Sequence, residues 1–151
     1  MEFLQAIEQI GPVRLLKASF FVYPVVNTLH IAAIGTLFGS VLLMDLSVLG
    51  AIRSVPHRIL VALLRRAALA AFVVAVLTGL ALFSVQATDY VRNPVFLAKL
   101  GLILLAGLNF FAFLALDRRP QENAAALRMS AVASILLWSG VLLAGRFIGF
   151  V

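Results

Sequence analysis

The fold is decided by residues 18–44, which read ASFFVYPVVNTLHIAAIGTLFGSVLLM. This stretch lies between Lys17 and Asp45, and His30 is the one residue within it whose side chain can carry a charge. A transmembrane α-helix needs about 20 consecutive apolar residues, so the stretch is long enough to cross a bilayer. An ionisable side chain is costly at such a depth, and His30 is therefore a candidate functional residue by default.

Three further apolar stretches follow, at residues 67–88, 100–116 and 129–145. The last two reach spanning length when the flanking lysine and arginine side chains extend toward the interfaces. Apolar runs that are continuous rather than alternating indicate helices and not a transmembrane barrel. The sequence predicts a single-domain all-α membrane protein, a four-helix up-down bundle with spans at about residues 18–50, 59–87, 94–116 and 124–147.

Turn and cap residues set the expected ends of these elements. Residues 1–10 carry apolar side chains at helical spacing and are followed by Gly11-Pro12, so we expect a short amphipathic helix at the membrane surface. Asn93-Pro94 combines a good N-cap with a proline suited to the first helical position, and it predicts the start of the third span.

The composition excludes several classes of protein. The chain is 64% hydrophobic and 12% charged, whereas about a quarter of a soluble domain is charged. The net charge is +6, and we expect the basic residues to contact anionic lipid. Binding to nucleic acid is not expected, because the sequence has no basic patch interleaved with exposed aromatic residues. The chain has no cysteine, which excludes thiolate metal sites, iron–sulfur clusters and covalently attached haem. It carries no stand-alone catalytic motif, and its few carboxylates do not outline an ion pathway.

The distribution of lysine and arginine predicts the orientation in the membrane. The first and third loops carry more of these residues than the termini and the second loop, so we expect those two loops in the cytoplasm and both termini in the periplasm of a bacterial inner membrane. The basic residues on the loop side are Arg53, Arg58, Arg65, Arg66, Arg118, Arg119 and Arg128, and those on the other side are Arg14, Lys17, Arg92, Lys99 and Arg146.

His30 admits three interpretations. It can be a neutral histidine that hydrogen-bonds to another helix, for instance to Asn109, Ser134 or Ser139. It can instead be an axial ligand of b-type haem or a ligand of another metal, or a proton-transfer group beside a quinone. Asn27 precedes it by one helical turn and is placed to orient the imidazole.

A cofactor at His30 needs space and a second ligand. Gly35 and Gly39 on the same helix either pack the bundle or leave room for a flat cofactor, and with Asn27 and Asn109 they complete the predicted cofactor site. His57 follows His30 by 27 residues, about 40 Å along a helix, so one haem cannot join them. Haem would need His30 alone, a second ligand other than histidine, or His30 from a second copy or a partner.

Charged residues near the helix ends suggest ion pairs that fix the register of the helices. Asp45 is expected to pair with Arg65 or Arg66, and Lys99 either to pair with Asp89 or to extend outward to the interface. The tryptophan Trp138 lies in the middle of a span, where we expect it to pack in the bundle or to form a wall of a pocket.

Several motifs together resemble a known family. Tyr23-Pro24, Thr28-Leu29-His30, Gly39-Ser40, Thr78-Gly79-Leu80 and Asn93-Pro94 are similar to an uncharacterised family of small bacterial four-helix membrane proteins, over about Arg14–Asn109. That resemblance implies an inner-membrane location and no established activity. More distantly, a histidine followed by small residues in a first helix resembles copper-resistance D-type proteins and four-helix b-type cytochromes, although this chain lacks a second histidine within its spans.

These observations lead to one main functional hypothesis and two alternatives. The main hypothesis is an inner-membrane module of a redox system, either an accessory or anchor subunit or a protein that holds b-type haem or serves a quinone through His30. The alternatives are a structural or assembly subunit without redox chemistry and a copper-handling membrane protein. In each case the expected partners are the bilayer and other membrane subunits or a second copy of the chain.

Overall fold

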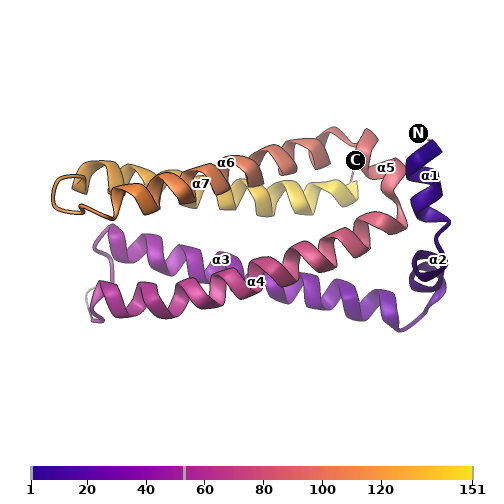
Figure 1. Ribbon diagram of the computed structural model, residues 1–151, viewed down its shortest axis with the longest axis horizontal. Coiled ribbons are helices and arrows are strands. Elements are labelled where there is room, and N and C mark those ends of the chain that lie inside the picture. Colours follow the sequence, from indigo (N-terminus) through magenta and orange to yellow (C-terminus); the bar gives the residue numbers. More distant parts are fainter. Residues whose placement is uncertain (1, 53, 151) are drawn as a thin grey trace.

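Four long helices dominate the computed structural model, which describes residues 2–52 and 54–150; Arg53 lies outside these residues. They are α3 (Val22–Val48), α4 (His57–Val85), α6 (Pro94–Leu116) and α7 (Ala124–Phe147). Each is long and apolar enough to cross a membrane. The helices alternate in direction (Figure 1), which confirms the predicted all-α four-helix up-down bundle.

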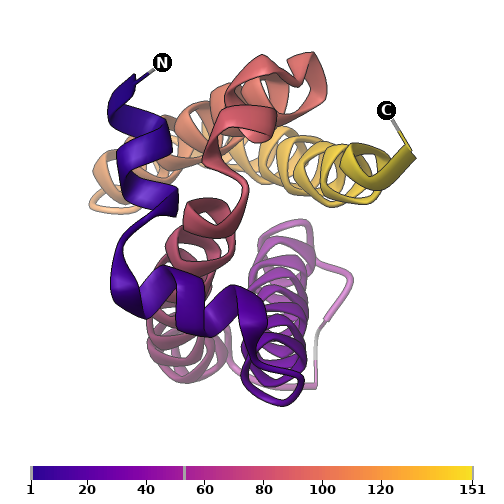
Figure 2. The same ribbon diagram turned by 90° about the vertical axis from the view of Figure 1, so that its right-hand side faces the viewer.

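The short helices gather at the end that carries both termini (Figure 2). They are α1 (Glu2–Glu8), α2 (Gly11–Ala18), α5 (Ala87–Arg92) and the 3₁₀ helix η1 (Ile148–Phe150). The sequence predicted one N-terminal helix ended by Gly11-Pro12, but Gly11-Pro12 also starts α2. Proline suits the first turn of a helix, because the N–H it lacks would have no helical partner there.

The ends of the long helices follow from local chemistry. The Asn93 side chain accepts hydrogen bonds from the backbone N–H groups of Val95 and Phe96, at 2.9 and 3.2 Å, and so caps α6. The bounds of α6 and α7 coincide with the predicted spans. The helix α4 ends two residues earlier than predicted, because Gln86 leaves the helical conformation (φ −141°, ψ 45°) and α5 begins directly after it.

The bundle consists of two helical hairpins. The helix α3 packs along α4, and α6 along α7, while the two hairpins meet mainly through α3 and α7. Ala68 and Ala71 of α4 are buried against Leu37 of α3, which lets the two backbones approach closely. Many large apolar side chains point outward, as expected where lipid surrounds the helices.

Polar contacts tie neighbouring elements together. Asn109 of α6 donates its amide N–H to the backbone carbonyl of Ser130 in α7 at 3.0 Å, and the Ser130 hydroxyl donates to Asn109 Oδ1 at 2.9 Å. At the end with the termini, a carboxylate oxygen of Glu8 accepts the backbone N–H of Thr88 at 2.9 Å, joining α1 to α5.

Candidate cofactor cavity around His30

His30 of α3 makes a hydrogen bond to the facing helix α4. Its Nδ1 lies 2.8 Å from the hydroxyl oxygen of Thr78. The bond crosses to another helix, as the structural interpretation of His30 predicted, but the partner is not Asn109, Ser134 or Ser139.

The surroundings of Thr78 indicate which nitrogen of His30 carries the proton. The Thr78 hydroxyl lies 2.6 Å from the backbone carbonyl of Val74, a good acceptor for its hydrogen. When the hydroxyl donates there, its oxygen can only accept from His30, and we infer that Nδ1 of the imidazole carries the proton. In a neutral imidazole protonated at Nδ1, the lone pair that can bind a metal or accept a proton lies on Nε2.

Gly79 provides the space that the imidazole occupies. A Cβ added at this position would lie 3.0 Å from Cε1 of His30 and 3.7 Å from its Nδ1. Such a contact is too short for any larger residue without a shift of the ring. The pair Thr78-Gly79 therefore holds His30 through a hydrogen bond at one residue and through close packing at the next.

His30 lines a cavity of about 550 Å³ between the two hairpins. The walls come from α3, α4, α5, α6, α7 and η1 and are predominantly apolar, with aromatic side chains such as Phe83, Phe96 and Trp138. Four lining residues carry a strongly polar or ionisable group, namely Asn27, His30, Tyr90 and Lys99. An apolar cavity with a few converging polar groups is the usual form of a cofactor or ligand site.

Lys99 brings a cation to this cavity without a carboxylate partner. The single ion pair within the described parts of the chain joins Arg119 to Glu122, so the predicted pair of Lys99 and Asp89 is not formed. The Lys99 ammonium lies instead against α7, where a Cβ at Gly145 would be 3.3 Å from Nζ. Lys99 and His30 line the same cavity, which places a cation and an imidazole on its walls.

Tyr90 closes the cavity toward the end with the termini. Its ring lies 6.1 Å from that of Phe83 and 5.2 Å from that of Phe96, centroid to centroid, so the three rings form one aromatic cluster. Burial raises the pKa of the Tyr90 phenol, and Tyr23 adds to this effect. The phenol therefore stays protonated and can donate a hydrogen bond at neutral pH.

The structure brings only part of the predicted cofactor site together. Asn27 lines the cavity with His30, but Thr78 is the residue that orients the imidazole. Gly35 and Gly39 do not line it, and a Cβ at either would meet nothing within 4 Å. Asn109 is engaged with Ser130 away from the cavity.

The predicted pairing of Asp45 with Arg65 or Arg66 is also not formed. Asp45 is buried, with 6% of its surface exposed, beside Ser134 of α7. Its Oδ2 has no hydrogen-bond partner. Both arginines are exposed on α4, which leaves them solvated or in contact with lipid headgroups.

Sequence reasoning missed Thr78, Gly79 and Tyr90 as site residues. Thr78-Gly79 was noted only as a family motif, and a hydroxyl directly before a glycine within a span could have marked the contact with His30. Within the residues that the structure describes, no three His, Cys, Asp or Glu side chains gather into a metal site, so His30 belongs to no such group.

Comparison with curated proteins and with solved structures finds no match to this sequence. The distant likeness to copper-resistance D-type proteins and b-type cytochromes therefore gains no support. Residues 16–151 match the family of unknown function DUF6644, and the chain, a membrane protein with four apolar helices, belongs to that family.

Proposed function

We propose that this protein is a membrane module of a redox system that binds an amphiphilic cofactor in the cavity between its hairpins, with b-type haem as the first candidate. The observation that carries the proposal is the hydrogen bond between His30 Nδ1 and Thr78, because it directs the imidazole lone pair to Nε2. Metal-ligating histidines commonly donate their other N–H in this way.

The residues of the cavity fit a haem group. His30 would hold the group through its imidazole, and the apolar walls from all four long helices would surround it. The ammonium group of Lys99 suits the carboxylate of a propionate. Of the described residues that line the cavity, the others whose side chains can donate a hydrogen bond to a bound cofactor are Asn27, Tyr90, Lys99 and Trp138. When bound, haem would supply one-electron chemistry.

A quinone is the second candidate, and the single histidine favours it. A quinone needs no histidine ligands, whereas one chain cannot supply two histidines to a haem, because His57 lies in another pocket at the far ends of the helices. His30 Nε2 can accept a hydrogen bond from a quinol hydroxyl, and Lys99 or Tyr90 can donate one to a carbonyl oxygen. Both candidates use the same lone pair of His30.

The competing proposal is a structural or assembly subunit. Its support is the same bond between His30 and Thr78, interpreted only as a contact that joins α3 to α4. A hydrogen bond between transmembrane helices stabilises a protein by on the order of 0.6 kcal/mol. Joining α3 to α4 would therefore be a small benefit for placing an ionisable histidine within a span.

The test is the visible spectrum of the protein purified in mild detergent, oxidised and reduced, followed by titration of the colourless fraction with haemin and with a short-chain ubiquinone analogue. We expect one ligand to bind at a one-to-one ratio. His30→Ala should abolish its binding, and the matched control His57→Ala should preserve it. A folded wild-type protein that binds neither ligand would leave the structural subunit as the function.

A further inference from the structure

A second pocket lies at the opposite end of the bundle, where the ends of the four long helices meet. Its volume is about 540 Å³, and it is formed by the end of α3, the start of α4, the end of α6 and the start of α7. His57 and Ala124, the first residues of α4 and α7, both line it. This position places the pocket at the level of the lipid headgroups if the four helices cross the bilayer.

The lining of this pocket is basic. Three arginines contribute to it, Arg58 and Arg65 from α4 and Arg128 from α7, together with His57. Asp117 is the acidic side chain among the described lining residues, and it forms no ion pair with the arginines. The three guanidinium groups are therefore not neutralised by carboxylates of the described chain.

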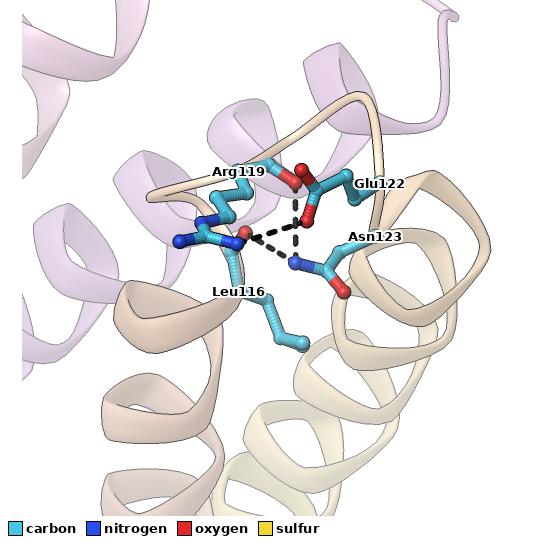
Figure 3. Close-up of polar contacts among 4 residues, drawn as sticks. All are labelled: Leu116, Arg119, Glu122 and Asn123. Atoms are coloured by element: carbon cyan, nitrogen blue, oxygen red, sulfur yellow. Dashed lines mark hydrogen bonds and ion pairs between the residues drawn. The ribbon is translucent and has the colours of Figure 1, made fainter.

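The loop between α6 and α7, next to the pocket, contains an arginine that is paired with a carboxylate. Figure 3 shows Arg119, whose Nη1 lies 3.4 Å from Oε2 of Glu122. In the same loop the Asn123 amide donates to the backbone carbonyls of Leu116 and Arg119, at 3.3 and 3.1 Å. These bonds hold the connection between α6 and α7 in place, and with it the start of α7 that carries Arg128.

Two further features favour an anion. The N-termini of α4 and α7 carry the positive ends of their helix dipoles, and neither N-cap side chain hydrogen-bonds to its helix. His57 is held in position by Ser47 of α3, whose hydroxyl oxygen lies 2.8 Å from its Nδ1. Apolar residues, among them Val61, Phe113 and Leu127, complete the lining.

We propose that this pocket binds a phosphate-bearing anion, with the arginines Arg58, Arg65 and Arg128 as its ligands. Guanidinium groups match the geometry of phosphate oxygens and form charge-assisted hydrogen bonds with them. Basic pockets between transmembrane helices commonly take anionic lipid headgroups. The phosphate can belong to such a headgroup, with the apolar lining beside the glycerol and first methylene groups, or to a small soluble anion.

The experiment measures binding to delipidated protein in neutral detergent, by native mass spectrometry and by thermal unfolding. Phosphatidylglycerol, zwitterionic phosphatidylcholine and inorganic phosphate are added separately. The pocket variant is Arg65→Gln with Arg128→Gln. The matched control is Arg66→Gln with Arg118→Gln, which removes the same charge from exposed residues near the same end that do not line the pocket.

We expect phosphatidylglycerol to bind the wild type and the control at least tenfold more tightly than phosphatidylcholine. The pocket variant should lose roughly tenfold or more of that affinity. The same pattern with inorganic phosphate alone would support the proposal with a soluble anion as the source. Equal binding of both lipids by the wild type, with no effect of phosphate, would overturn it, as would equal losses in the two variants.

Two measurements keep the test valid if the double variant fails to fold. The single variants Arg65→Gln and Arg128→Gln should each weaken binding, and the lipid preference of the wild type is measured without any substitution. The outcome is independent of the proposed cofactor site, because His30 and its cavity share no residue with this pocket.

Discussion

Nδ1 of His30 lies 2.8 Å from the hydroxyl oxygen of Thr78, and this contact joins α3 to α4 inside the bundle. Because the Thr78 hydroxyl lies within hydrogen-bond distance of the Val74 carbonyl, we infer that the contact also selects the imidazole tautomer. One threonine thus sets both the position of the ring and the nitrogen that is available to a ligand. The predictions at this site follow from that double role.

Thr78→Val should remove the preference of His30 for one imidazole tautomer while keeping the shape of the side chain at position 78. In the wild type we expect the ¹⁵N NMR signals of His30 to show a protonated Nδ1 and an unprotonated Nε2. In Thr78→Val the two tautomers should mix, because the valine cannot accept the N–H. Haemin should bind roughly 10–100-fold more weakly, as expected when the partner of a metal-ligating histidine is removed.

The chain has two histidines, so His57→Ala assigns the signals directly. Thr78→Ser retains the hydroxyl and should behave as the wild type in both measurements. If His30 has the same tautomer in Thr78→Val and in the wild type, Thr78 does not set the protonation of the ring.

The fold was largely predictable because the forces that decide it are local to each segment. Long apolar runs such as residues 18–44 determine the spans, and the Asn93-Pro94 cap sets the start of α6 within the same few residues. The departures also have local causes. Gln86 ends α4 early, and Gly11-Pro12 begins a second helix after α1 has ended at Glu8. How the two hairpins meet depends on contacts between distant segments, which the pattern along one helix does not contain.

The site was less predictable for the same reason. His30 is visible in the sequence because it is a costly residue in an apolar run, but its partner depends on which face of which helix it meets. Gly35 and Gly39 lie near His30 along α3, whereas the space for the ring comes from Gly79, which follows His30 by 49 positions. Asp45 and Asn109 likewise face α7, where Ser134 and Ser130 lie beside them.

Gly79→Ala should disturb the His30 site by steric conflict. The added Cβ would lie 3.0 Å from Cε1 of His30, so the ring must shift by a few tenths of an ångström, and we expect this shift to disturb its bond to Thr78. We expect a loss of about 1–3 kcal/mol in the free energy of unfolding, the usual cost of overpacking. The measurement is thermal or denaturant unfolding in detergent, together with haemin affinity.

Gly35→Ala is the matched control, since a Cβ there meets nothing within 4 Å. It should be neutral or should stabilise the protein by up to about 1 kcal/mol, because alanine is the better helix former. Equal losses for the two variants would show that helix flexibility, and not contact with His30, accounts for the effect of Gly79.

Asp45→Asn should raise the melting temperature or leave it unchanged. The carboxyl group is buried, one of its oxygens has no hydrogen-bond partner, and no arginine pairs with it. Removing a buried charge that lacks a partner relieves a desolvation cost, and a gain of about 1 kcal/mol corresponds to roughly 2–4 °C. Thermal unfolding measures the change, with Arg66→Gln as a companion variant that should have little effect. Breaking a buried ion pair would instead cost about 3–5 kcal/mol. A loss of that size in Asp45→Asn would contradict the prediction and would indicate that Asp45 is paired with an arginine.

Glu8→Gln should loosen α1 from α5 in a pH-dependent way. The hydrogen bond from the backbone N–H of Thr88 lowers the pKa of the Glu8 carboxyl below its usual 4.5. Since this pKa is lower in the folded than in the unfolded protein, the stabilisation is complete above pH 4.5 and is lost as the pH falls through the folded value. At pH 7 we therefore expect the Thr88 amide to exchange its hydrogen about a few-fold faster in Glu8→Gln, because a neutral amide oxygen is a weaker acceptor than a carboxylate.

The difference between wild type and Glu8→Gln should shrink on acidification, since protonation of Glu8 has the same effect as the substitution. Asp89→Asn is the control, because it removes a carboxylate from α5 that makes no hydrogen bond to α1 in the described structure. Its Thr88 exchange should match that of the wild type at each pH. Equal acceleration in both variants would mean that net charge near α5 governs the exchange, and the contact between Glu8 and Thr88 would then not be what holds α1 against the end of the bundle.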